Sequence, residues 1–261
     1  MNLTSYALSI DAPVCRYVDL DLRLDPDCER ELSEDERVRA SRLHFGIDRE
    51  RFIAAHVALR RALAEQSALR ADTLCLICGP FGKPWMPERP RIRFSLSHSH
   101  ALALIAVGTR GPLGADVEHL RPVPDALTLA ERHFTPREYE ALLALPAARR
   151  GLAFLTCWTR KEACLKAIGL GLRVRPDTVE VGLRPELRSV EVPLGGRTLW
   201  LVVGPAPARA GSVASLAEWR APETLFDTPE ALSQMLAMQA LRANPRAAFA
   251  GDPVRGVEVT R

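Results

Sequence analysis

The chain has 261 residues, of which 47% are hydrophobic and 26% are charged, an ordinary globular composition with enough length for one large domain or two small ones. Its formal net charge of +3 suits an anionic ligand or partner, but it is too small to indicate a nucleic-acid-binding protein. No apolar run is long enough to cross a membrane, which excludes a spanning helix.

The N-terminal part of the chain predicts a strand and then two helices. Residues 1–30 alternate short apolar runs with aspartate and proline, which is typical of a first strand followed by a loop. Ser33 and Glu36 have the spacing of a capping box, so a helix should begin there. This helix and the next combine an apolar face with an arginine-rich face that includes Arg39 and Arg51. Most of these arginines are expected to be solvated, whereas one or two could reach a phosphate group.

A strand over residues 73–78 and a stiff loop should follow. Cys75 and Cys78 have the spacing of zinc ligands, but no second pair completes a site, so buried thiols are expected. Absence of an apolar leader at the N-terminus predicts a reducing, cytoplasmic location. Lys83 is one of only three lysines among 35 basic residues, and glycines and prolines surround it, so it is presented on a rigid loop. A tight turn explains the same residues equally well.

The most informative stretch covers residues 94–118. Residues 101–107 are a short apolar run punctuated by glycines, which predicts a buried strand. In the following strand Asp116 and Glu118 should project from the same side, because successive side chains alternate between faces. Two carboxylates that share a small space suit a hard cation such as Mg²⁺ or Mn²⁺. A solvated acidic face on an edge strand is the alternative interpretation.

The histidines before this strand leave two weaker hypotheses. The sequence Ser97-His98-Ser99 does not indicate a serine hydrolase, because no Gly-x-Ser-x-Gly elbow is present and adjacent residues of a strand point apart. His98 and His100 share a face and could bind a transition metal. This hypothesis is weaker than the carboxylate site, because the two histidines are a lone pair with abundant carboxylates nearby.

The C-terminal half predicts helices and then an antiparallel sheet. Residues 135–138 form a capping box with proline at the first helical position, and residues 152–168 predict a longer helix. Glu162 and Lys166 lie four residues apart on one face of that helix; alone, such a pair contributes about 0.2–0.5 kcal/mol at a surface. Strand-like alternation over residues 173–219 indicates an antiparallel sheet. An apolar helix over residues 230–242 leads into a tail expected to be peripheral or disordered.

Four motifs together resemble the surfactin-type 4′-phosphopantetheinyl transferases. In the order and spacing of that family, within residues 33–185, the chain contains Gly82-Lys83-Pro84, Phe94-Ser-Leu-Ser-His-Ser99, Gly114-Ala-Asp-Val-Glu118 and Trp158-Thr-Arg-Lys-Glu-Ala-Cys-Leu-Lys166. The resemblance implies an α+β fold with two pseudo-symmetric α+β lobes in one chain. The lobes are expected over residues 1–118 and 119–225, followed by a peripheral helical or disordered tail over residues 226–261.

The resemblance also implies an activity and its partners. Coenzyme A would bind between the lobes with Mg²⁺, for which Mn²⁺ could substitute. The phosphopantetheine arm would pass to a serine of an apo acyl or peptidyl carrier protein, with release of 3′,5′-ADP. A monomer should suffice, because both lobes lie in one chain, and neither a nucleic acid nor a membrane is expected as a partner.

The resemblance also implies roles for individual residues, carried over from the matching positions of the family's motifs. Asp116, Glu118 and Glu162 match the metal ligands, and Glu162 also matches the base that family mechanisms propose for the carrier serine. Lys166 matches the lysine near the pyrophosphate, and His98 the histidine that contacts coenzyme A. The set expected to bind coenzyme A is completed by Ser97, Lys83, Arg39 and Arg51, the two arginines lying where basic residues hold the 3′-phosphate.

Some residues depart from the family pattern or receive no role. Ser95 stands where asparagine is usual, and Ala115 where a larger aliphatic residue is common. Lys161 is expected to face elsewhere on its helix and to have no direct role. A coenzyme A or nucleotide binding module without transferase activity is the alternative function. The joint presence of Asp116, Glu118, Glu162 and Lys166 argues against it, because a pure binder needs no general base beside its metal.

Overall fold

The computed structural model describes residues 13–79, 81–170, 174–194 and 197–219. The helix predicted over residues 230–242 and the tail over 226–261 lie outside the described residues. Within them, helices combine with antiparallel sheets, which confirms the predicted α+β class. None of the helices in the described part is both long and apolar enough to cross a bilayer.

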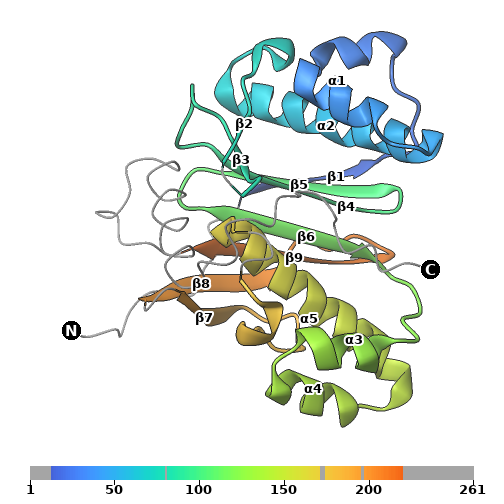
Figure 1. Cartoon of the computed structure of the whole chain (residues 1–261), viewed down its shortest axis with the longest axis vertical. Coiled ribbons are helices and arrows are strands. Elements are labelled where there is room, and N and C mark those ends of the chain that lie inside the picture. Colours follow the sequence, from blue (N-terminus) through green and yellow to red (C-terminus); the bar gives the residue numbers. More distant parts are fainter. Residues whose placement is uncertain (1–12, 80, 171–173, 195–196, 220–261) are drawn as a thin grey trace.

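The first sheet has the strand order β1-β5-β4 and is covered by helices on its outer side (Figure 1). Its antiparallel strands are β1 (Val14–Asp19), β4 (Arg93–Ser99) and β5 (Leu102–Gly108). Helix α2 (Gly46–Ser67) packs on this sheet, and α1 (Glu34–Ser41) lies beside α2. Leu59 and Leu63 of α2 share a core with Phe94 and Ile105 of the sheet. The six residues from Leu102 to Val107 are all buried, as the apolar run predicts.

The second sheet has the order β6-β9-β8-β7 and carries its helices on the opposite side of the molecule (Figure 1). Its strands are β6 (Leu113–His119), β7 (Arg188–Leu194), β8 (Arg197–Pro205) and β9 (Ser212–Trp219). Helix α5 (Ala147–Ile168) packs against β6 and β9, with α3 (Ala126–His133) and α4 (Pro136–Leu143) beyond it. The inner faces of the two sheets meet in a core that includes Leu104, Ala115, Val117 and Leu216. The pseudo-symmetry of two lobes, and their boundary at residue 118, stay predictions.

The remaining elements are short. A hairpin of β2 (Ile77–Cys78) and β3 (Pro84–Trp85) carries the loop with Lys83, and short 3₁₀ helices cover Pro26–Glu31, Ala71–Thr73 and Pro176–Thr178. The prediction of buried thiols at Cys75 and Cys78 is wrong, because both cysteines are exposed. The strand expected over residues 73–78 shrinks to its last two residues, which pair with β3 in a sheet of two strands.

The helix starts follow the local sequence. Ser33 and Thr135 each accept a hydrogen bond from the amide three residues later, and the carboxylates of Glu36 and Glu138 each accept one from the cap amide. Both predicted capping boxes are therefore confirmed. Each satisfies amides that the first helical turn leaves without a partner.

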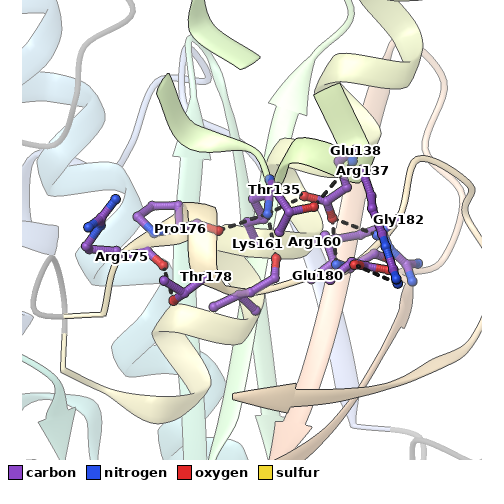
Figure 2. Close-up of polar contacts among 12 residues, drawn as sticks. Thr135, Arg137, Glu138, Arg160, Lys161, Arg175, Pro176, Thr178, Glu180 and Gly182 are labelled. Carbon is purple, nitrogen blue, oxygen red and sulfur yellow. Dashed lines mark hydrogen bonds and ion pairs between the residues drawn. The ribbon is translucent and has the colours of Figure 1, made fainter. Parts of the chain in front are cut away.

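A buried ion pair between Lys161 and Glu138 holds α5 in one orientation about its axis (Figure 2). Lys161 is 0% exposed, and its Nζ lies 2.6 Å from the Glu138 carboxylate and donates to the carbonyl oxygens of Pro176 and Val179. Although burial opposes ionisation, Lys161 holds the pKa of Glu138 below its usual value. These carbonyl groups lie in a stretch predicted as a strand, but they accept hydrogen bonds from a side chain of α5 instead of from a neighbouring strand. As expected, Lys161 points away from the carboxylates of β6.

Candidate active site

Two carboxylates of the site lie on β6 because its residues alternate. Ala115 and Val117 point into the core between the sheets, so Asp116 and Glu118 share the other side of the strand. Asp116 is only 5% exposed, whereas Glu118 is half-buried. The prediction of a shared face is therefore confirmed, and a freely solvated acidic face is excluded for Asp116.

Gly114 lets β6 lie directly against α5. A Cβ atom at this position would stand 1.9 Å from the carbonyl oxygen of Ala163 and 2.5 Å from the amide nitrogen of Ala167. Only glycine fits such a close approach of strand and helix backbones. The contact places the α5 turn that carries Glu162 and Lys166 beside the two carboxylates of β6.

Asp116 is the centre of the polar contacts. Lys166 Nζ lies 2.6 Å from Asp116 Oδ1, and the Ser97 hydroxyl donates to the same oxygen at 2.7 Å. Asp116 Oδ2 is buried and has no hydrogen-bond partner among the described residues. A buried carboxylate oxygen without a partner is costly unless a cation or donor approaches it.

Glu118 and Glu162 surround Asp116 with further negative charge. Glu118 Oε2 accepts hydrogen bonds from Ser99 Oγ at 2.8 Å and from Arg121 at 3.2 Å. Burial, and less strongly the charge of Asp116, raise the pKa of the Glu118 carboxyl. Burial followed by the charge of Asp116 raises the pKa of Glu162 to about 7. The three carboxylates thus repel one another in a partly desolvated space.

The three carboxylates are chemically suited to bind a hard divalent cation. Carboxylate oxygens are the ligands that Mg²⁺ prefers, and the partnerless Asp116 Oδ2 has a free acceptor position. In the described part of the chain, however, no three His, Cys, Asp or Glu side chains are gathered closely enough to form a preformed metal cluster. The Lys166 ammonium supplies the charge that neutralises Asp116 in this arrangement.

Ser97 and His98 extend the site along β4. The Ser97 hydroxyl donates to Asp116 and accepts from the amide of Val117 and from Lys166, which uses its one donor and both acceptor positions. A direct contact of Ser97 with coenzyme A would therefore need one of these bonds to be exchanged. His98 is exposed and lies within electrostatic range of Asp116 and Lys166. His100 instead lies with its ring 5.8 Å from that of His119, not paired with His98.

The other predicted coenzyme A ligands have partners of their own. Arg51, which also acts electrostatically on His98, forms a two-bond ion pair with Asp21 at 2.7 and 2.9 Å. Arg39 is exposed and stacks over the ring of Phe52. Lys83 Nζ donates to the carbonyl oxygens of Leu113, Lys166 and Ala167, so its ammonium caps the end of α5. The structure does not bring Arg39 and Lys83 to the carboxylates.

Two residues of the site, Ser99 and Arg121, are not predicted by the motifs to have a role. Both bind Glu118. The serines at positions 95, 97 and 99 share a face of one strand, which is a signal visible in the sequence. Arg121 lies two residues beyond the end of β6 and carries no signal of its own.

Comparison with known proteins gives consistent matches. Residues 112–202, which contain Asp116, Glu118, Glu162 and Lys166, match the 4′-phosphopantetheinyl transferase superfamily. The chain is 39% identical over 162 residues to 4′-phosphopantetheinyl transferase HetI of Nostoc sp. strain PCC 7120, which covers 61% of this chain and 68% of that protein. Over 163 residues it is 31% identical to 4′-phosphopantetheinyl transferase ffp of Bacillus subtilis and 29% identical to Sfp of Bacillus subtilis strain 168, covering 62% of this chain and 71% of each relative.

Proposed function

The chain belongs to the 4′-phosphopantetheinyl transferase superfamily, and we propose that it moves the phosphopantetheine arm of coenzyme A to a serine of an apo carrier protein. The contact of Lys166 with Asp116, beside an oxygen that lacks a partner and a glutamate of raised pKa, is the observation that carries this proposal. Such a cluster suits the handling of a pyrophosphate with a cation.

The proposed cation site consists of Asp116, Glu118 and Glu162. Bound Mg²⁺, or Mn²⁺ in its place, would supply charge neutralisation on the pyrophosphate oxygens. A pyrophosphate also offers Lys166 a second anionic partner beside Asp116. His98, at the exposed end of β4, is positioned to donate to a phosphate oxygen of coenzyme A.

The chemical step is a displacement at the phosphorus that bears the pantetheine arm. The carrier serine oxygen forms a bond to this phosphorus, the bond to the 3′,5′-ADP oxygen breaks, and 3′,5′-ADP leaves. Glu162 is proposed to accept the serine proton, because a carboxylate with a pKa of about 7 is well matched to general base catalysis at neutral pH. Glu162 could serve as metal ligand, as base or as both.

Recognition of the adenosine 3′-phosphate is proposed for Arg39 and Arg51. A phosphate would replace the Asp21 carboxylate as the partner of Arg51, which preserves a two-bond geometry. A contact between Lys83 and coenzyme A stays a prediction, because three carbonyl oxygens already use its ammonium donors. The monomeric state and the cytoplasmic location are also predictions.

Release of 3′,5′-ADP tests the proposal. The full chain, coenzyme A, Mg²⁺ and an apo carrier protein are incubated, and nucleotide products are quantified by chromatography. We expect 3′,5′-ADP in proportion to the carrier supplied, and none without carrier or after chelation of the metal. Binding of coenzyme A without release on any carrier would instead support the alternative, a binding module without transferase activity.

Cation affinity should depend on pH. Only ionised Glu162 can bind a cation, and its pKa of about 7 means that a proton competes below that pH. Mg²⁺ binding is therefore expected to strengthen as the pH rises from about 6 to about 8, with release of a proton near pH 7. Calorimetry in buffers of different ionisation enthalpy measures that release; a pH-independent affinity would remove Glu162 from the cation site.

A further inference from the structure

We propose that Ser99 is a positioning residue of the transfer site, which holds the Glu118 carboxylate in place for the cation. Ser95, Ser97 and Ser99 form what we call the serine row, which lies on one face of β4 and binds the backbone of β6. The consequence for transfer rests on the proposed function, but the contacts of the serine row do not.

The serine row takes the place of a missing strand. Among the described strands, β6 lies at the edge of its sheet, with β9 as its hydrogen-bonded neighbour, so alternate amides on its other side have no backbone partner in that part of the chain. These amides belong to Ala115, Val117 and His119, and they donate to Ser95, Ser97 and Ser99 at 2.9, 3.3 and 3.2 Å, respectively. Side-chain hydroxyls thus satisfy an edge that is covered by the other sheet.

Two members of the row also hold carboxylates. Ser97 donates its hydroxyl proton to Asp116 at 2.7 Å, and Ser99 donates to Glu118 at 2.8 Å. Each hydroxyl therefore bonds a carboxylate and the amide of the next residue, which fixes the strand and the side chain together. Ser95 differs, because its hydroxyl bonds only the backbone of Ala115 among the described residues.

This arrangement gives Ser99 a function separate from packing. The Glu118 oxygen bound by Ser99 also accepts from Arg121, so a donor at the end of β4 and a donor beyond the end of β6 together orient one carboxylate. Among the described residues, the other oxygen, Oε1, accepts no hydrogen bond, so it is open to a ligand. Removing a partner that orients a metal ligand in this way typically lowers the affinity for the metal by about 10–100-fold.

Ser95 provides a matched control. Ser99→Ala and Ser95→Ala each remove one hydroxyl that binds a β6 amide, but only Ser99→Ala frees a carboxylate. With Mn²⁺ as the probe, followed by electron paramagnetic resonance of the free ion, Ser99→Ala should weaken binding by about tenfold or more. Ser95→Ala should leave the affinity unchanged, and Ser99→Thr, which keeps the hydroxyl, should restore it. Equal affinities of Ser99→Ala and the wild type would overturn the inference.

A second measurement needs no metal. The shift in urea midpoint caused by Ser99→Ala is compared in the wild type and in a Glu118→Ala background, which removes the acceptor of the Ser99 hydroxyl, with Ser95→Ala treated in the same way. A smaller shift for Ser99→Ala in the Glu118→Ala background, with no such change for Ser95→Ala, supports the inference; additive shifts for both overturn it. If the wild type bound no Mn²⁺, the cation part of the proposed function would fail, and this cycle would decide the role of Ser99.

Discussion

Replacing Asp116 with asparagine is expected to reduce phosphopantetheine transfer roughly 100-fold or more, which corresponds to about 2.7 kcal/mol of transition-state stabilisation. The change removes the negative charge that pairs with Lys166 and the anionic oxygen that lacks a partner. Asparagine has nearly the same shape and can still accept from Ser97, so the loss should come from charge. Initial rates of carrier modification measure it, together with the concentration of Mg²⁺ needed for half-maximal rate.

Glu34 offers a control for this substitution. It is an exposed glutamate of α1 whose only charged contact in the described residues is the ion pair with Arg37, so Glu34→Gln should leave the rate unchanged. Glu162→Gln should act like Asp116→Asn, because it removes both a proposed ligand and the proposed base. Full transfer activity of Glu162→Gln would exclude both roles of that residue.

Gly114→Ala is expected to destabilise the protein by about 3 kcal/mol or more, at the upper end of the cost of overpacking a core. The new methyl group would lie 1.9 Å from the Ala163 carbonyl oxygen, and both neighbours of the clash are backbone, so no side chain can move aside. Strand β6 must then shift away from α5, which separates Asp116 from Lys166. Urea unfolding should show the lower midpoint, and the folded fraction should show slower transfer.

Gly46→Ala is the matched control for the glycine substitution. Nothing lies within 4 Å of a Cβ atom at Gly46, which is the first residue of α2. Alanine there should be neutral or stabilising by up to about 1 kcal/mol, because it is the better helix former. If Gly114→Ala unfolded at the same urea concentration as Gly46→Ala, the close contact of β6 with α5 would be contradicted.

Local patterns predicted those elements whose causes are local. The capping boxes at Ser33 and Thr135 depend on residues three positions apart, and the buried strand β5 depends on an apolar run of its own. Residues 179–181 alternate like a strand but form none, because their carbonyl groups bind Lys161 and Arg160 on α5. Such competition from a distant side chain leaves no trace in the local sequence.

The same distinction applies to the site. Strand and helix periodicity placed Asp116 with Glu118 and Glu162 with Lys166, but only the family resemblance indicated that the two pairs meet. The physical reason for their meeting is the backbone contact at Gly114, which no pattern around that glycine reveals. For Lys83, the motif predicts a contact with coenzyme A, whereas its ammonium donates to three backbone carbonyl groups. The local sequence could not indicate these acceptors, because they lie 30, 83 and 84 residues further along the chain.

If this chain attaches phosphopantetheine to a carrier serine, as we propose, the mass of the carrier must increase by that of one such group. A panel of apo acyl and peptidyl carrier proteins is incubated with the protein, coenzyme A and Mg²⁺, and intact masses are recorded with and without EDTA. We predict a gain of one phosphopantetheine group on at least one carrier, absent with EDTA and absent when the acceptor serine is changed to alanine. No gain on any carrier, although calorimetry shows that coenzyme A binds, would contradict the claim.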